Sequence, residues 1–278
     1  MDEKTKNIPE LTEVNKYTWW LEILDEKFWK LNKSDYIVLV WSTWHWKTEF
    51  ALFQAIQNAK VWNKVCFISL EMSPNNLIDR LCKRKANITV VEDNNKNIPT
   101  EKMLKYTKCR TELLQNENLE ITWLKSYDIE DIITFIKEQA KNWYTLFYID
   151  NFWLISSNNS YNETELSNEI ILKLKQLTNE LWIAIVWIHY FKKWDYNSHK
   201  GLTDIRWSGK IENIADYILS ISRCWENMKL KMLKNRMNWI LWKCELMFKN
   251  NTYVIDDTTV KQYDTFNDYD DDYDDDDY

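Results

Sequence analysis

The sequence predicts an α/β fold: a mainly parallel, twisted sheet flanked by helices, with antiparallel strands toward the C-terminus. Two observations predict it. Short apolar runs alternate with longer segments of helical periodicity as far as about residue 188, which is the pattern of a parallel sheet covered on both faces. From about residue 200 to about residue 255 the chain carries mostly short apolar runs, which indicates strands paired in hairpins.

The expected elements follow from these patterns. Strands are expected at 36–40, 64–70, 119–124, 145–149 with Asp150 at the end, and 183–188. Helices are expected from the end of the 41–48 stretch to about residue 60, and at 75–87, 99–116, 128–142 and 163–180. Asp128 is expected to cap its helix. An asparagine-rich loop is expected between 87 and 99, and a polar loop at 158–163.

One sizeable buried core is expected, because the chain has 278 residues and 45% of them are hydrophobic. We divide it into an arm at 1–16, one α/β domain at 17–256 and a disordered acidic tail at 257–278. The net charge of −7 comes from the tail: nine of the 43 acidic residues are aspartates from Asp264 onward, which leaves 34 against 36 lysines and arginines. A near-neutral body is compatible with a polyanionic partner. The tail suits protein recruitment, competition with a polyanion, or solvation alone.

The cysteines and the apolar runs exclude two classes of protein. The five cysteines show no CxxC pair and no paired spacing, so we expect reduced thiols and a cytoplasmic location rather than a disulfide-rich secreted protein. No apolar run approaches membrane-spanning length and the N-terminus lacks a signal-peptide pattern, so no membrane partner is expected.

Glycine and tryptophan have unusual counts, with 2 glycines and 17 tryptophans. Average usage of about 7% predicts roughly 19 glycines. Several tryptophans also occupy positions typical of glycine, since Trp62, Trp143 and Trp182 each follow a predicted helix and precede a strand. We therefore hypothesise that the gene uses UGA as a glycine codon, as some bacterial lineages do, and was translated with a table that reads UGA as tryptophan. The alternative is a protein that is simply rich in tryptophan.

A phosphate-binding loop follows the first strand. The stretch consists of Trp41, Ser42, Thr43, Trp44, His45, Trp46, Lys47 and Thr48. With glycine restored it fits G-x-x-x-x-G-K-[ST] between a strand and a helix. Glycine is needed because backbone N–H groups curl around the phosphates with no room for a Cβ. Lys47 would reach the β- and γ-phosphates of ATP and Thr48 would hold Mg²⁺, whereas tryptophans at 41, 44 and 46 would leave only a chance Lys-Thr pair.

Three further polar residues follow predicted strands. Asp150 ends its strand at the position of a carboxylate that binds the water shell of Mg²⁺, although a strand-terminal aspartate is often only a turn residue. Glu71 suits a carboxylate that orients and deprotonates the attacking water, or a first-turn glutamate that stabilises a helix dipole. His189 suits a residue that senses the γ-phosphate, or a structural histidine.

These pieces in this order resemble the hexameric replicative helicases of the DnaB-like family, which includes the phage T7-type and mitochondrial Twinkle helicases. The resemblance covers residues 17–256 and implies a RecA-like P-loop core. Glu71 in Ser69–Ser73 matches the catalytic glutamate and His189 the γ-phosphate sensor. Leu202–Gly209, L-T-D-I-R-G-S-G with glycine restored, is similar to the DNA-contacting motif. Lys234, Arg236, Trp239 and Trp242 resemble the K-x-R…G…G hairpin.

The resemblance also implies roles beyond the nucleotide. Arg236 would be a finger on the neighbouring subunit's ATP in a hexameric ring, and Arg223 matches a base-stacking arginine. Single-stranded DNA would be held by basic residues facing the pore, namely Lys192, Lys193, Lys200 and Arg206. A primase or a loader would be a further partner. Two alternatives stay open: a RecA/RadA-like recombinase or KaiC-like ATPase, and, if the tryptophans are literal, a scaffold that binds no nucleotide.

Overall fold

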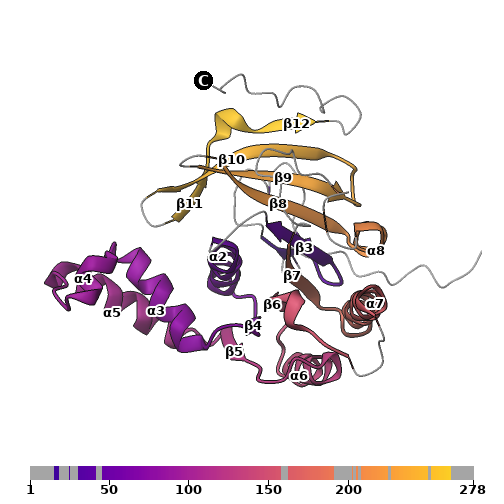
Figure 1. Cartoon of the computed structure of the whole chain (residues 1–278), viewed down its shortest axis with the longest axis horizontal. Helices are drawn as coiled ribbons and strands as arrows, with labels where there is room; N and C mark the ends of the chain where they lie inside the picture. Colours follow the sequence, from indigo (N-terminus) through magenta and orange to yellow (C-terminus); the bar gives the residue numbers. More distant parts are fainter. Residues whose placement is uncertain are drawn as a thin grey trace, which may run out of the picture.

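The computed structural model describes residues 16–18, 25, 31–41, 46–157, 162–190, 202, 205, 208–224, 227–249 and 252–263. Its main sheet has the strand order β11-β10-β9-β8-β3-β7-β6-β4-β5, with β12 also paired to β10 (Figure 1). The strands from β8 to β5 in that order are parallel, and β9 to β12 extend the sheet with antiparallel pairs. This arrangement confirms the predicted fold class.

The strands of the main sheet agree with the predicted runs. They are β3 (Tyr36–Trp41), β4 (Val65–Ser69), β5 (Leu119–Trp123), β6 (Leu146–Asp150), β7 (Ala184–Tyr190), β8 (Tyr217–Cys224), β9 (Asn227–Asn235), β10 (Leu241–Lys249), β11 (Thr252–Ile255) and β12 (Lys261–Tyr263). A separate two-stranded sheet pairs β1 (Lys16–Tyr17) with β2 (Leu31–Asn32). Tyr17 is buried and its hydroxyl donates to the Thr145 carbonyl at 2.7 Å, which joins this small sheet to the main body.

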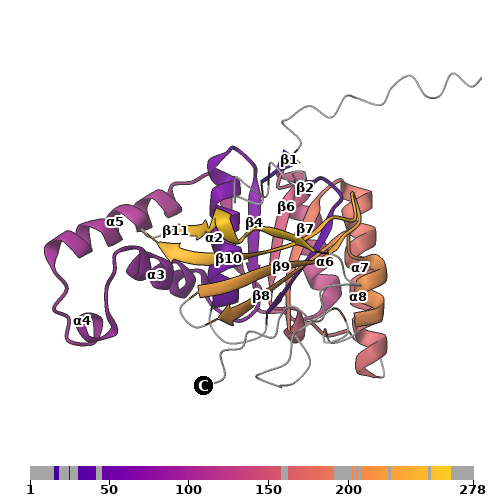
Figure 2. The same ribbon diagram turned by 90° about the horizontal axis from the view of Figure 1, so that it is seen from above.

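Helices cover both faces of the sheet. Alternate side chains of β3 enter two different apolar clusters: Ile37 and Leu39 pack with side chains of α2, and Val38 and Val40 pack with those of α6 and α7. A short helix, α8, lies beside α7 (Figure 2). The helices are α2 (Trp46–Lys60), α3 (Pro74–Lys85), α4 (Val90–Asn94), α5 (Thr100–Leu114), α6 (Ile129–Lys141), α7 (Glu163–Leu181) and α8 (Ser208–Ile214). No helix within the described residues is long and apolar enough to cross a membrane.

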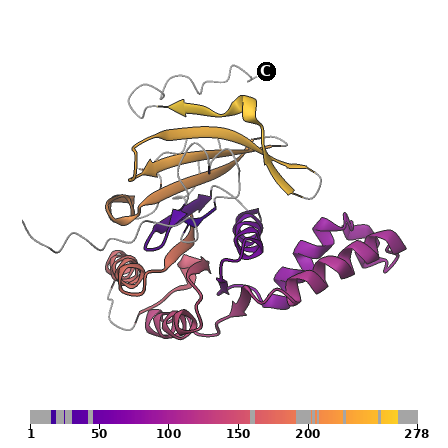
Figure 3. The same cartoon turned by 180° about the vertical axis from the view of Figure 1, so that it is seen from behind.

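The helices α3, α4 and α5 form a helical projection from the body (Figures 1 and 3). Its base is tied to α2 by Arg80, whose Nε donates to Glu49 Oε1 at 2.8 Å. Between α3 and α5 the sulfur atoms of Cys82 and Cys109 lie 3.1 Å apart in the buried interface. Both are free thiols, as the sequence predicts.

Two short helices and one boundary differ from the expected elements. The asparagine-rich loop contains α4, which begins with a capping box in which Glu92 Oε2 accepts from Thr89 N at 2.7 Å. The segment after residue 200 contains α8, which is stabilised by burial of Ile211.

The predicted tail at 257–278 begins too early. Residues 261–263 form β12 on the edge of β10, and Thr259 Oγ1 accepts from Glu245 N at 2.8 Å. The ordered domain therefore extends at least to Tyr263, and the aspartates at 264–278 lie outside the described residues.

Four tryptophans adopt the left-handed backbone conformation. Trp62, Trp143, Trp182 and Trp239 have φ values of 69°, 69°, 53° and 61°, and their exposures are 85%, 80%, 67% and 77%. Positive φ is strained for a bulky residue and is the usual conformation of glycine after a helix. Exposure also shows that these indoles contribute nothing to the core. The backbone at these positions therefore favours glycine, which supports the codon hypothesis without testing it.

Candidate active site

Most of the predicted catalytic and nucleotide-contacting positions that the structure describes lie at one edge of the sheet, and Arg236 lies at the opposite one. The strands β4, β6, β7, β3 and β8 are parallel neighbours, so their carboxyl ends lie along the same edge, where α/β proteins bind ligands. Glu71 follows β4, Asp150 ends β6, His189 is the penultimate residue of β7, Trp41 ends β3, and Arg223 is the penultimate residue of β8.

Lys47 and Thr48 lie in the first turn of α2, beside Asp150 at the end of β6. Thr48 Oγ1 donates to Asp150 Oδ2 at 2.7 Å, and both residues are buried. Burial lowers the pKa of Lys47, and the charges of Asp150 and Glu71 oppose that shift. Burial raises the pKa of Asp150, and Lys47 and Thr48 oppose that shift. A cation and two oxygen donors thus lie together where the helix dipole favours an anion.

Glu71 is joined to this group by Asn151. The backbone places it there, because Ser69 of β4 is paired with Asp150 of β6, and Leu70 N donates to the Asp150 carbonyl at 2.6 Å. The Asn151 side chain donates from Nδ2 to Glu71 Oε2 at 3.2 Å. The peptide bond between Asp150 and Asn151 is cis. Glu71 is itself exposed, so its carboxylate is accessible from solvent beside Lys47.

His189 lies inside the sheet, next to the strand that leads to the phosphate loop. It is fully buried and is paired in register with Val40 of β3. Its ring lies 5.5 Å from that of Phe152 and 5.2 Å from that of Trp187. Trp187 is also fully buried, and its Nε1 has no hydrogen-bond partner among the described residues. A buried indole N–H without an acceptor costs free energy that glycine would not incur.

The structure describes only some of the remaining predicted contact residues. Trp41 is described, and it is buried against Phe50 with ring centroids 6.4 Å apart. Trp46 begins α2, and Arg223 lies in β8 at the expected edge, but neither side chain is among those described. The predicted residues outside the described part are Ser42, Thr43, Trp44, His45, Lys192, Lys193, Lys200 and Arg206.

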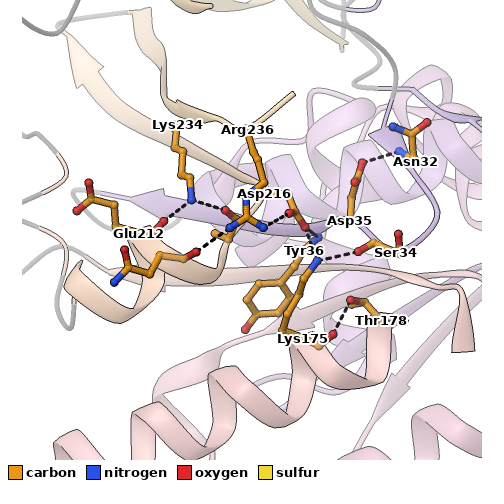
Figure 4. Close-up of polar contacts among 12 residues, drawn as sticks. Asn32, Ser34, Asp35, Tyr36, Lys175, Thr178, Glu212, Asp216, Lys234 and Arg236 are labelled. Atoms are coloured by element: carbon orange, nitrogen blue, oxygen red, sulfur yellow. Dashed lines mark hydrogen bonds and ion pairs between the residues drawn. The ribbon is translucent and has the colours of Figure 1, made fainter. Parts of the chain in front are cut away.

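Arg236 lies in a network of polar contacts that converges on Asp216 (Figure 4). Its Nη1 donates to Asp216 Oδ1 at 3.0 Å, and its Nη2 donates to the Asn213 carbonyl at 2.8 Å. Asp216 Oδ2 accepts from Lys175 Nζ at 2.7 Å and from Tyr36 N at 2.9 Å. Both carboxylate oxygens of the buried Asp216 are therefore bonded, and the guanidinium of Arg236, 45% exposed as a side chain, is held at the surface.

The contacts of Arg236 and the phosphate loop before Lys47 lie at opposite ends of β3. Asp216 contacts Tyr36, the first residue of β3, whereas the phosphate loop follows Trp41, the last residue. At about 3.3 Å per residue the strand separates the two ends by about 16 Å. The guanidinium of Arg236 therefore lies toward the end of β3 opposite to the end that leads to Lys47.

The described residues fit a magnesium–nucleotide ligand. The Thr48 hydroxyl and the Asp150 carboxylate are the oxygen donors that Mg²⁺ prefers, and Asp150 Oδ1 is buried without a hydrogen-bond partner among the described residues. Lys47 supplies a cation at a helix N-terminus that follows a central strand. Together with the parallel sheet, these features are those of the P-loop nucleotide-binding fold.

The chain belongs to the DnaB-like helicase C-terminal domain family, which matches residues 20–255. It is similar to the probable plasmid replicative DNA helicase of Chlamydia psittaci, with 30% identity over 206 residues, 72% of this chain and 45% of that protein. The probable plasmid replicative DNA helicase of Chlamydia trachomatis is 28% identical over 229 residues, 77% of this chain and 49% of that protein. The chain thus spans about half the length of these curated relatives.

Two solved structures have the same fold. One, described as an ATPase domain, has a TM-score of 0.75 at 19% identity, covering 84% of this chain and 89% of that one. A second is described as "The Structure Of A DnaB-Like Replicative Helicase And Its Interactions With Primase"; it has a TM-score of 0.71 at 19% identity and covers 80% of this chain and 57% of that one. The RecA-like fold predicted from the motifs is confirmed.

Asn151 and Asp216 contact the predicted catalytic residues but were not singled out from the sequence. Asn151 directly follows Asp150, the predicted metal-binding residue, and an amide at the end of an apolar strand is a detectable signal. Asp216 directly precedes β8, yet its partners come from segments about 180 and 40 residues upstream, at Tyr36 and Lys175. Only the fold brings those residues together.

Proposed function

We propose that the chain is the ATP-hydrolysing motor of a replicative-type DNA helicase that moves along single-stranded DNA. Family membership over residues 20–255 supports the class of motor. The observation that carries the proposal is the separation of the two halves of the site. Lys47, Thr48, Asp150 and Glu71 lie at the carboxyl edge of the sheet, and Arg236 lies at the amino edge.

Each residue of the carboxyl edge has a role in this proposal. Lys47 binds the β- and γ-phosphates of ATP, and Thr48 with Asp150 holds Mg²⁺, which when bound would neutralise phosphate charge. Glu71 orients the attacking water and accepts its proton. His189, in the strand beside the phosphate loop, responds to loss of the γ-phosphate.

The amino edge supplies a residue to a neighbouring copy. Because Arg236 lies toward the end of β3 opposite to Lys47, we assign it to the site of the next subunit in a ring, which we propose to be a hexamer. Lys192, Lys193, Lys200 and Arg206 track the phosphates of one DNA strand in the pore, and Arg223 stacks on a base. A primase or a loader is a further proposed partner, and the cytoplasm the proposed location.

Nucleotide binding in this proposal requires glycine at positions 41, 44 and 46. A phosphate that is cradled by backbone N–H groups leaves no room for an indole, so the chain written with tryptophan fails to bind ATP. The left-handed conformations of Trp62, Trp143, Trp182 and Trp239 support the same substitution elsewhere in the chain. The motor is therefore the product that carries glycine at these positions.

Mixing two inactive variants tests whether the site is shared between subunits. In the glycine-containing chain, Arg236→Ala and Glu71→Gln should each lower DNA-stimulated ATP hydrolysis by about 10³-fold or more while sparing nucleotide binding. A one-to-one mixture should regain hydrolysis, because some interfaces combine an intact Glu71 with an intact Arg236. No recovery in a mixture that sediments as mixed rings would overturn the shared site, and full turnover by Arg236→Ala alone would remove the finger role. Strand displacement rather than strand exchange by the glycine-containing chain without other substitutions separates a helicase from a recombinase.

A further inference from the structure

Asn151 is held between two contacts that use opposite ends of its side-chain amide. Its Oδ1 accepts from Trp153 N at 2.8 Å, and its Nδ2 donates to Glu71 Oε2 at 3.2 Å. A backbone N–H can only donate, so the contact with Trp153 fixes which end of the amide is oxygen. The amide nitrogen must then point at Glu71. Asn151 is 5% exposed, so few other rotamers are open to it.

The Glu71 carboxylate has no comparable support from its own segment. Glu71 follows β4 and is exposed, and within the described residues Asn151 is the side chain shown to hydrogen-bond to it. A glutamate side chain loses rotamer freedom when it is held in place, so a neutral donor that adds no competing charge is well suited to fix it.

We propose that Asn151 is a positioning residue that holds the Glu71 carboxylate in the orientation required to activate water. The inference rests on the proposed role of Glu71 in ATP hydrolysis. In this proposal Asn151 acts on hydrolysis through Glu71. Loss of the contact lowers kcat and leaves nucleotide binding unchanged.

The Asn151→Ser variant separates this role from the capping contact. Serine is as good a cap as asparagine, so its hydroxyl can still accept from Trp153 N, but the shorter side chain does not extend to Glu71. In the full glycine-containing chain we expect kcat to fall about 10- to 100-fold, while KM for ATP stays within about twofold and Tm is unchanged. Asn162→Ser is the matched control, because Asn162 Oδ1 caps α7 by accepting from Glu165 N at 2.9 Å and contacts no catalytic residue.

A double-mutant cycle with Glu71→Gln decides whether Asn151 acts through Glu71. Asn151→Ser should cost nothing further in the Glu71→Gln background, since the carboxylate it serves is already gone. A full additional loss there, or an unchanged kcat for Asn151→Ser alone, overturns the positioning role. If Glu71→Gln itself hydrolyses ATP normally, the proposed function of Glu71 fails instead, so the two failures are distinguishable. A fall in Tm for Asn151→Ser but not for Asn162→Ser would make the contact structural.

Discussion

The buried aspartates at the two ends of the central strands differ in how completely their carboxylate oxygens are hydrogen-bonded. At the amino end, Asp216 has both carboxylate oxygens bonded within the subunit, to Lys175, Tyr36 and Arg236. At the carboxyl end, Asp150 has one oxygen bonded to Thr48 and a second without a partner among the described residues. The first end is a closed network that presents one arginine at the surface. The second leaves an oxygen that a metal ion can use.

The largest expected effect is a gain of nucleotide binding at the carboxyl end. The chain with tryptophan at 41, 44 and 46 should show no measurable ATP binding, because a loop that cradles phosphates with its backbone N–H groups has no room for a side chain at these positions. Restoring glycine at these three positions should give saturable binding by isothermal titration calorimetry. Glycine at the exposed Trp62, Trp143, Trp182 and Trp239 is the control: it should raise stability and leave binding absent.

The next effect is on folding stability at the amino end. Lys175 and Lys173 lie two residues apart on α7, but Lys175 pairs with the buried Asp216 and Lys173 with the more exposed Glu130 and Glu169. Lys175→Met should lower the free energy of unfolding by about 1.5–3 kcal/mol, because it leaves a buried carboxylate with one fewer charged donor. Lys173→Met should cost less than about 1 kcal/mol. Equal losses in urea denaturation would contradict the contrast between the two lysines.

Asp35 should make stability depend on pH at the same end. Burial raises the pKa of Asp35 to about 7, helped by Asp216 and opposed by the Asn32 backbone and by Lys175. The folded state then binds the proton more tightly than the unfolded chain, so stability is greatest below about pH 4 for this group and falls as pH rises to about 7. Between pH 5 and pH 8 this group should cost about 2–3 kcal/mol.

Asp35→Asn should remove that loss, since an amide does not titrate and can still accept from Asn32 N, which lies 2.6 Å from Asp35 Oδ2. Urea denaturation of both proteins at the two pH values measures it. A variant that loses as much stability with rising pH as the unmodified protein would contradict the role of Asp35.

Sequence patterns were sufficient to predict the features that depend only on neighbouring residues. The apolar runs before Trp41, Asp150 and His189 predicted three central strands, and the helix-to-strand junctions predicted where the backbone takes positive φ. The capping box at Thr89 was also present in the sequence, but it was obscured by the surrounding asparagines and lysine. These features depend on neighbours within a few residues.

Long-range contacts were not predictable in the same way. The three residues of β12 carry no strand pattern of their own, and they form a strand because they pair with β10. Lys261–Tyr263 was therefore assigned to the acidic tail. Asp216 became a central acceptor only because β8 lies beside β3. Asn151 and Glu71 are 80 residues apart in the chain, and they meet because β4 and β6 are neighbours in the sheet. All three contacts depend on the pairing of strands that are distant in the sequence.

The identity of the residue at each tryptophan position decides whether the carboxyl end can bind a nucleotide at all. Mass spectrometry of the protein purified from its natural host, with sequencing of the peptide that spans residues 41–48, measures it directly. We predict glycine at 41, 44 and 46 and an intact mass well below 34.0 kDa. Tryptophan in that peptide, with an intact mass of 34.0 kDa, would contradict this prediction.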